Sequence, residues 1–434
     1  MTFWQATLHT PGFATTAILA FMLPASAVVP VAAAQAHSLA QASSRETVLY
    51  AFTGGEDGAG PVAGLVEDAT GAFYGTTTLG GGGPCYSGAG CGTVFKLTPS
   101  AHGYVESVLY RFNGTEDGAY PWGGLALDAS GALYGTTVQG GNCSESEGCG
   151  TVFKLTPRGM GYKETILHSF EKHNRHDGAF PDGSLIIDGS GTLYGTTGSG
   201  GESGYGSVFK LAKSGDDYVE KILHSFHSGN DGEQPLAGLI ADPSGALYGT
   251  TNLGGSGGDG TVFKLTPQGS GYAESVIYAF QSGGNPYGSV IGDASGALYG
   301  TTTLGPGQTN GTVFELTPAG GGYAERDLYT FPNNGLQGGF PYAGLVTGRR
   351  GALYGTTIEG GAYGLGTAYS LTPKGVHGAY TTTVVHSFGG GNDGNSPADQ
   401  LIADKNGALY GTTKSGGTAG CSNYGCGTVF RLNP

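Results

Sequence analysis

The densest group of side chains with chemical potential is a short run of histidine and aspartate in the first half of the chain. His173, His176 and Asp177 lie within five residues, and an equivalent stretch further on carries His227 and Asp231. Imidazole and carboxylate groups can bind a transition metal or act as acid and base, so a metal site formed by His173, His176 and Asp177 is one hypothesis. The alternative is that the histidines are ordinary exposed loop residues and that the aspartate serves the fold of its loop. Counterparts of this aspartate recur along the chain, as Asp57, Asp117, Asp231 and Asp393.

Three further histidines, His168, His224 and His386, occupy a position at which other parts of the chain carry tyrosine. The tyrosines are Tyr50, Tyr110, Tyr278 and Tyr329. We therefore interpret these histidines as packing residues. No serine-hydrolase, zinc-protease, phosphate-loop or dinucleotide motif occurs in a convincing context. The sequence predicts no catalytic residue and no cofactor.

The six cysteines form three close pairs: Cys85 with Cys91, Cys143 with Cys149, and Cys421 with Cys426. Each second cysteine directly precedes Gly-Thr-Val-Phe, so the pairs are equivalent to one another. Zinc is the competing interpretation, but these spacings lack the paired short knuckles of structural zinc sites. We expect three local disulfides, which are typical of exported proteins.

Aromatic residues vary around a proline that recurs along the chain. They are Tyr120, Trp122, Phe180, Tyr287, Phe340 and Tyr342. Exposed rings on variable loops suit stacking on sugars or anchoring a protein partner, so these six are the candidate ligand-binding residues. The alternative is that the rings only cover the ends of neighbouring structural units.

These residues are positioned by a repeat whose signature, Gly-Ala-Leu-Tyr-Gly-Thr-Thr, is complete at residues 131–137. Seven copies occur, at intervals of 51 to 60 residues, which indicates a repeat architecture. Their tyrosines are Tyr74, Tyr134, Tyr194, Tyr248, Tyr299, Tyr354 and Tyr410.

Each unit contains four short segments of strand composition, which we call A, B, C and D. In the second unit they are residues 121–128, 131–138, 150–156 and 163–170. An Asp-x-x-Gly stretch between A and B suits a type I turn, and Thr-Pro-x-Gly-x-Gly-Tyr between C and D suits a hairpin. Small residues beside Leu, Tyr, Val and Phe indicate strands that are buried on both faces, as in sheets stacked around an axis. We therefore predict an all-β, seven-bladed β-propeller of four-stranded antiparallel blades.

The two ends of the repeat array complement each other. The first segment, residues 47–52, is of type D, and the last, residues 427–432, is of type C and lacks its D. We predict that the N-terminal strand pairs with the strand around Val429 and closes the ring. With A innermost, the D to A and B to C loops share one end of the propeller, which carries the length variation, the cysteines and the candidate aromatic residues.

The Leu-Tyr-Gly-Thr-Thr, Gly-Thr-Val-Phe-Lys-Leu-Thr-Pro and Asp-Gly-x-x-Pro-x-x-Gly-Leu segments resemble the GloVer tandem repeat of bacterial secreted, "choice-of-anchor" proteins. The resemblance covers residues 46–434, and the order of the segments is also similar to NHL-type propeller blades. It implies a secreted or surface protein and no settled activity. The chain ends at Pro434 directly after a C segment, so we expect no C-terminal anchor.

Residues 1–36 have the features of a secretory signal peptide, because the apolar, alanine-rich stretch 15–36 ends in Ala34-Gln35-Ala36. The first fourteen residues contain no Lys or Arg, so an uncleaved membrane anchor is the alternative. Residues 37–45 form a short polar lead-in, and residues 46–434 form the propeller. We expect a secreted or periplasmic protein, with association to the cell surface as a further option.

The composition limits the partners. A net charge of −14 without a basic cluster disfavours nucleic acid and anionic membrane surfaces. Although 87 residues are glycine, 38% of the chain is hydrophobic and 11% aromatic, which favours an ordered fold. We expect a monomeric, non-catalytic propeller that binds a protein or glycan through its D to A and B to C loops. The alternative is a propeller hydrolase, lyase or oxidoreductase with its site at the mouth of the central channel.

Overall fold

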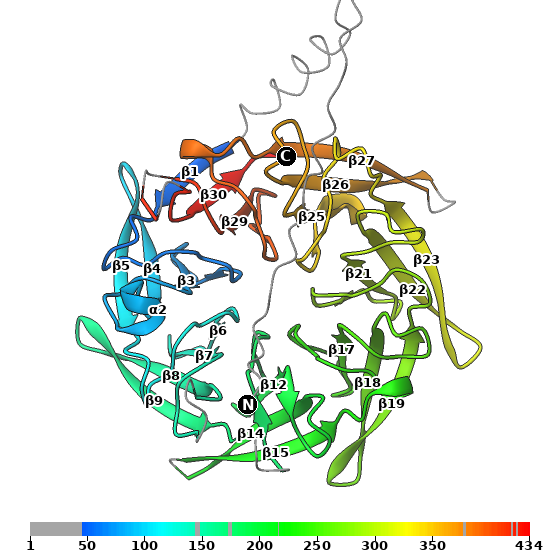
Figure 1. Cartoon of the computed structure of the whole chain (residues 1–434), viewed down its shortest axis with the longest axis horizontal. Coiled ribbons are helices and arrows are strands. Elements are labelled where there is room, and N and C mark those ends of the chain that lie inside the picture. Colours follow the sequence, from blue (N-terminus) through cyan, green and yellow to red (C-terminus); the bar gives the residue numbers. More distant parts are fainter. Residues whose placement is uncertain are drawn as a thin grey trace, which may run out of the picture.

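Seven four-stranded antiparallel sheets stand around a common axis in the computed structural model (Figure 1). The structure describes residues 46–143, 148–171, 176–215, 217–375, 379–417, 420–421 and 424–434. Within these residues each four-stranded sheet is one blade, and in six of the seven blades the strands run in sequence order from the axis outward. The prediction of a seven-bladed all-β propeller is confirmed.

The first three blades follow directly along the chain. Blade 1 consists of β2 (Val66–Glu67), β3 (Phe73–Thr77), β4 (Thr93–Ser100) and β5 (Gly103–Arg111). Blade 2 consists of β6 (Ala126–Leu127), β7 (Leu133–Thr137), β8 (Thr151–Arg158) and β9 (Gly161–Ser169). Blade 3 consists of β11 (Ile186–Ile187), β12 (Leu193–Thr197), β14 (Ser207–Ser214) and β15 (Asp217–Ser225).

Three more blades repeat the pattern. Blade 4 consists of β16 (Ile240–Ala241), β17 (Leu247–Thr251), β18 (Thr261–Gln268) and β19 (Gly271–Ala279). Blade 5 consists of β20 (Ile291–Gly292), β21 (Leu298–Thr302), β22 (Thr312–Ala319) and β23 (Gly322–Thr330). Blade 6 consists of β24 (Val346–Thr347), β25 (Leu353–Thr357), β26 (Thr367–Lys374) and β27 (Ala379–Ser387).

Blade 7 is built from both ends of the repeat array. Its strands β28 (Ile402–Ala403), β29 (Leu409–Thr413) and β30 (Thr428–Leu432) are completed on the outside by β1 (Glu46–Ala51). In this antiparallel pair Val48 lies opposite Phe430, and Tyr50 lies opposite Val429. The predicted closure of the ring by the N-terminal strand is confirmed.

The loops contain few further elements. They are α2 (Cys85–Gly88), the short pair β10 (Gly178–Ala179) and β13 (Ser199–Gly200), and the 3-10 turns η2 (Gly229–Asp231), η3 (Arg349–Gly351) and η5 (Gly391–Asp393). None of the helices in the described part of the chain combines the length and apolar character that crossing a lipid bilayer requires.

Each residue of the Tyr-Gly-Thr-Thr signature makes a separate contact, as blade 1 shows. The Tyr74 hydroxyl donates to Asp68 of the preceding turn at 2.8 Å, where backbone amides also bind the carboxylate. Gly75 lies opposite Phe95, and a Cβ at Gly75 would come within 2.6 Å of the Phe95 ring. Thr77 pairs with a threonine hydroxyl on β4 at 2.8 Å, while Thr76 reaches the backbone of the next blade. The signature therefore links the turn, the sheet and the neighbouring blade.

Blades also meet through aromatic pairs. The phenylalanine that follows each D strand packs edge-on against an aromatic residue on the C strand of the next blade, with ring centroids about 5 Å apart. Phe52, which follows the closing strand, meets Phe95 of blade 1 in this way at 5.1 Å. The seam is thus packed like the other blade junctions.

The innermost strands are shorter than the sequence suggested. In blade 2 only Ala126 and Leu127 pair as β6, although residues 121–128 have strand composition. The preceding backbone bonds to the adjacent blades instead: Gly123 accepts a bond from Thr76 of blade 1, and Gly124 donates to Ser184 of blade 3. This segment therefore ties three blades together near the axis.

Candidate functional site

The residue before the recurring proline has a left-handed backbone in all seven blades. Its φ lies between 53° and 63° in each case. The seven residues are Gly60, Tyr120, Phe180, Gln234, Asn285, Phe340 and Ser396. Six of them carry a side chain, and a left-handed backbone at such residues costs of order 1–3 kcal/mol, strain that concentrates at functional sites.

Two backbone hydrogen bonds hold this conformation. The amide of Tyr120 donates to the carbonyl of Cys91 in the B to C loop of the preceding blade at 2.9 Å, and its own carbonyl accepts from Val138 at 3.1 Å. The other six positions make the same two bonds. The backbone is therefore identical around the ring, and only the side chain that it presents changes.

The predicted aromatic residues belong to this ring of loops. Tyr120, Phe180 and Phe340 hold the position before the proline, and the other three follow the proline. Trp122 is 52% exposed, whereas Tyr120 and Phe180 are half-buried and pack against the hydrophobic clusters of their blades. Residues 287 and 342, both tyrosine, stack across blades 5 and 6 with ring centroids 4.4 Å apart. The structure places the six on one end of the propeller and brings this one pair into ring contact.

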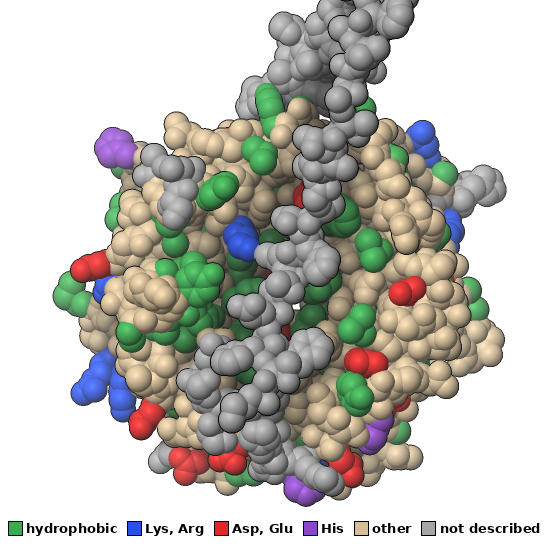
Figure 2. All heavy atoms as spheres, viewed as in Figure 1, with side chains coloured by type: hydrophobic (Ala, Val, Ile, Leu, Met, Phe, Trp, Pro, Cys, Tyr) green, Lys and Arg blue, Asp and Glu red, His purple; other side chains and the backbone are tan. Residues whose placement is uncertain are grey.

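We call the end of the propeller that is formed by the D to A and B to C loops the loop face. Exposed aromatic side chains concentrate there. Among the described residues, every exposed large aromatic side chain lies there: Tyr86, Trp122, Tyr205, Tyr363 and Tyr424. Figure 2 shows hydrophobic side chains at several places round the ring, with charged ones mainly toward the rim. Four of these five residues, all except Trp122, were not predicted from the sequence because they lie in glycine-rich B to C loops of unequal length.

Two carboxyl groups break the symmetry near the axis. Asp182 takes the position that Trp122 holds in blade 2, and Asp399 lies one residue later in blade 7, where the other blades have glycine or alanine. Burial raises the pKa of both carboxyl groups to about 7, although the backbone amide of Gln400 donates to Asp399. Neither aspartate was predicted as a site residue from the sequence, although both stand out when the residues after each recurring proline are aligned.

The outer rim carries a second recurring arrangement, at the junctions between D strands. In five of the seven blades the D-strand tyrosine or histidine bonds to the aspartate of its own D to A loop, as Tyr110 does to Asp117 at 3.0 Å. The aspartate also accepts a backbone amide of its loop, from Asn113 in this case. The aspartates therefore do shape their loops, as the alternative interpretation held.

A glutamate from the next D strand faces this aspartate in five junctions. These are Glu46, Glu106, Glu164, Glu220 and Glu274, and in each the buried Oε1 atom has no hydrogen-bond partner. Burial, reinforced by repulsion from the loop aspartate, raises the glutamate pKa to about 7 at Glu106 and Glu164 and to about 8 at Glu46.

Histidine replaces tyrosine at three of these junctions. The Nε2 atoms of His168, His224 and His386 lie 3.0, 3.0 and 2.8 Å from Asp177, Asp231 and Asp393. Each ring also packs edge-on against the phenylalanine two residues later, so the packing interpretation is confirmed. It missed the polar partner, because the aspartate and the glutamate converge only in the folded ring.

Of the three predicted metal ligands, the structure describes two, His176 and Asp177. His173 lies outside the described residues, and Asp177 bonds to His168 and two backbone amides. His176 is exposed at the edge of a hollow of about 420 Å³. The hollow is lined by His176, Glu202, Glu220, Lys221, Ile222 and Ser225.

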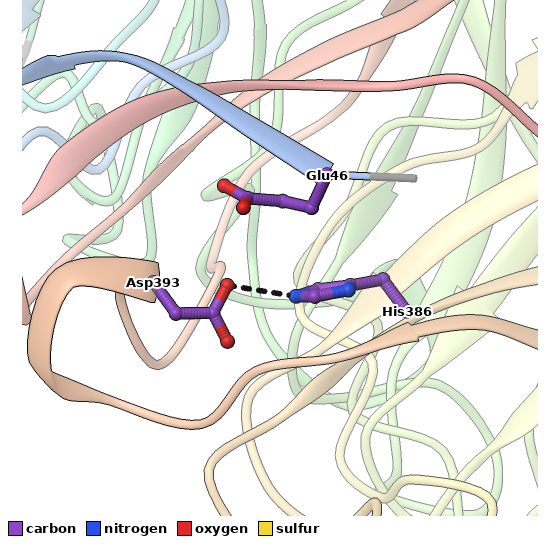
Figure 3. A group of neighbouring side chains, drawn as sticks. All are labelled: Glu46, His386 and Asp393. Carbon is purple, nitrogen blue, oxygen red and sulfur yellow. Dashed lines mark hydrogen bonds and ion pairs between the residues drawn. The ribbon is translucent and has the colours of Figure 1, made fainter. Parts of the chain in front are cut away.

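Within the described residues, two other groups bring three ligand atoms within 4.8 Å of one another. One is His224, Asp231 and Glu274, and the other is Glu46, His386 and Asp393 (Figure 3). Figure 3 shows the three side chains of the second group pointing toward one another from β1, from β27 and from the loop between blades 6 and 7.

The three cysteine pairs are bonded as expected. Cys85–Cys91, Cys143–Cys149 and Cys421–Cys426 are disulfides with Cα atoms 5.0, 5.6 and 5.4 Å apart. They lie in the B to C loops of blades 1, 2 and 7, so three consecutive blades around the seam carry one each on the loop face.

Repeated blades, signature contacts and a closed ring define the chain as a tandem-repeat β-propeller. It belongs to the Gloeobacter/Verrucomicrobia repeat family, whose model matches residues 35–242, 85–305, 143–346 and 308–434. This membership confirms the resemblance seen in the sequence. No curated protein matches the chain.

Solved structures share the propeller fold. One is the extracellular domain of a protein described as a hybrid two-component system of B. thetaiotaomicron, with a TM-score of 0.55 and 12% sequence identity. The match covers 90% of this chain and 40% of the B. thetaiotaomicron chain. A fungal alcohol oxidase of the AA5 family, solved with copper, has a TM-score of 0.54 and 15% identity, covering 87% of this chain and 74% of that chain. At these identities the likeness shows the fold alone.

Proposed function

We propose that this chain is an exported, non-catalytic scaffold that binds a glycan or protein through its loop face. The observation that carries the proposal is the ring of seven left-handed positions, where one fixed backbone presents Gly, Tyr, Phe, Gln, Asn, Phe and Ser. Variable side chains on a rigid frame are the usual design of a recognition surface.

The chemistry of the face favours a sugar ligand. The exposed aromatic residues are tyrosine and tryptophan, which combine a flat apolar ring with a hydrogen-bonding group. A pre-ordered backbone also reduces the entropy lost on binding. Three disulfides on this face support an oxidising compartment, outside the cytoplasm.

Binding can be tested on a glycan array with the triple variant Tyr120→Ala, Trp122→Ala and Phe180→Ala. We expect the wild type to bind a subset of glycans and the variant to lose at least tenfold in affinity. The matched control removes exposed apolar groups from the opposite end, Met160→Ala with Val105→Ala, and should bind as the wild type does. If the triple variant binds glycans as tightly as the wild type, the binding site lies elsewhere. If the wild type binds proteins but no glycan, a sugar is excluded as the ligand.

A second candidate function is catalysis at the axis, favoured by Asp182 and Asp399. Two carboxyl groups whose pKa lies near 7 suit acid and base roles. Under this alternative, Asp182→Asn and Asp399→Asn would each abolish hydrolysis of a glycan that the protein binds while leaving affinity within about twofold. Absence of turnover in the wild type would leave the binding scaffold as the function.

A further inference from the structure

At most junctions between D strands the loop aspartate faces either a tyrosine hydroxyl or a histidine nitrogen. The junctions between blades 3 and 4 and between blades 6 and 7 are of the histidine kind. Where Tyr110 offers a hydroxyl to Asp117, His224 offers a ring nitrogen, which lies 3.0 and 3.2 Å from the two oxygens of Asp231. A neutral imidazole nitrogen has a lone pair for a metal ion. These two of the three histidine junctions therefore provide a nitrogen ligand beside two carboxylates, with the ligand atoms of each group within 4.8 Å of one another.

The buried oxygens at these junctions lack a partner. Glu274 Oε1 and Glu46 Oε1 are both buried and accept no hydrogen bond in the structure. His386 is 1% exposed, so the Nε2 atom that faces Asp393 lies in a buried site. Buried polar atoms are nearly always paired, and those that are not point to a missing ion or water.

We propose that His224, Asp231 and Glu274 bind one divalent transition-metal ion, and that Glu46, His386 and Asp393 bind a second. One imidazole with two carboxylates is a ligand set that Zn²⁺ accepts. Metal–ligand distances of about 2.1 Å place neighbouring ligand atoms about 3–3.5 Å apart, so atoms that already lie within 4.8 Å need only small side-chain rotations.

The first site has an additional ligand within reach. His227 Nδ1 lies 3.3 Å from Asp231, and its side chain is 55% exposed, so it is free to rotate toward the ion. The second site has a structural consequence, because Glu46 is the first residue of the closing strand β1. An ion bound there joins β1 to blade 6 and holds the N-terminal strand in the ring.

The test is the Zn²⁺ stoichiometry of tag-free protein after chelator treatment, measured by calorimetric titration and by metal analysis after dialysis. We expect two ions per chain. His224→Tyr and His386→Tyr should each bind one ion fewer, and the double variant should bind none. Tyrosine is native to this position in four blades and bonds to the loop aspartate in blades 1 and 7, so these variants retain the local packing.

A control separates these sites from surface histidines. His102 is exposed in a C to D turn, and His102→Tyr should leave the stoichiometry at two. Zn²⁺ should also raise the Tm of the wild type and leave that of the double tyrosine variant unchanged. The proposal is overturned by a wild type that binds no Zn²⁺ at micromolar concentration, or by a double variant that binds as many ions as the wild type.

Discussion

The Thr412 hydroxyl donates a hydrogen bond to the backbone carbonyl of Ala63 at 3.3 Å, although 349 residues separate them. The same bond joins each blade to the next, for example Thr196 to Ala237 at 2.8 Å. The junction between blades 7 and 1 is therefore chemically equivalent to the other junctions, and the two ends of the repeat array meet inside blade 7, where β1 pairs with β30.

The packing at the seam leads to the first prediction. Phe52 is fully buried and meets Phe95 edge-on, so Phe52→Ala should lower the free energy of unfolding by about 3–5 kcal/mol. Thermal and denaturant unfolding measure this loss. Thr47→Ala, an exposed change on β1, the strand that Phe52 follows, should leave stability within about 0.5 kcal/mol. Equal stability of the two variants would mean that the contact of Phe52 with Phe95 does not stabilise the ring.

The glycine of the signature gives the second prediction. A Cβ at Gly249 would lie 2.5 Å from the Phe263 ring, so Gly249→Ala should destabilise the protein by about 1–3 kcal/mol through overpacking. Gly161→Ala is the matched control, because a Cβ there meets nothing within 4 Å. Urea unfolding should separate the two variants, and a neutral Gly249→Ala would show that the ring can move aside.

The disulfides give the third prediction. Each closes a loop of only five or six residues, so each should add about 2 kcal/mol under the chain-entropy model. Intact-mass measurement after alkylation without reductant should find no modified cysteine. Addition of reductant should then expose six alkylation sites and lower the Tm. Six alkylated cysteines before reduction would contradict the pairing.

The sequence predicted the fold because each of its signals was local and repeated. The Asp-x-x-Gly turn before Tyr74 needs only the residues around Asp68, and the structure forms it as expected. Ring closure followed from a D segment at one end and a missing D segment at the other. The turn and the ring closure both depend only on which segments follow one another along the chain, and this succession can be read from the sequence.

The junction sites could not be found in this way because their members come from separate units. Glu274 lies fifty residues from His224, and nothing in either segment indicates that their side chains converge. The left-handed backbone of the residue before each proline could not be predicted from the sequence for a different reason. Tyr120 and Phe340 are poor formers of this backbone, and hydrogen bonds from two blades hold them there.

The last prediction concerns pH and the tyrosine junctions. Glu106 is faced by Asp57, Tyr50 and Arg111, and Glu164 by Asp117 and Tyr110. Burial and then aspartate repulsion raise both glutamate pKa values from 4.5 to about 7. A carboxyl group whose pKa is raised by folding stabilises the fold fully below about pH 4.5, and this stability is lost as the pH rises through 7. The Tm should therefore fall between pH 5 and pH 8.

The double variant Glu106→Gln with Glu164→Gln should remove part of this fall, because glutamine does not titrate. The measurement is Tm against pH with chelator present, so that the histidine junctions carry no ion. Turn aspartates such as Asp68 affect stability in a lower pH range. Burial opposes their ionisation, but hydrogen bonds from Thr70 and Tyr74 prevail and lower the pKa of Asp68 below 3.8. The stability that these aspartates contribute is therefore lost only in stronger acid. The exposed Glu116→Gln should follow the wild-type profile. A double variant that also follows it would show that Glu106 and Glu164 are ionised in the folded protein at pH 5.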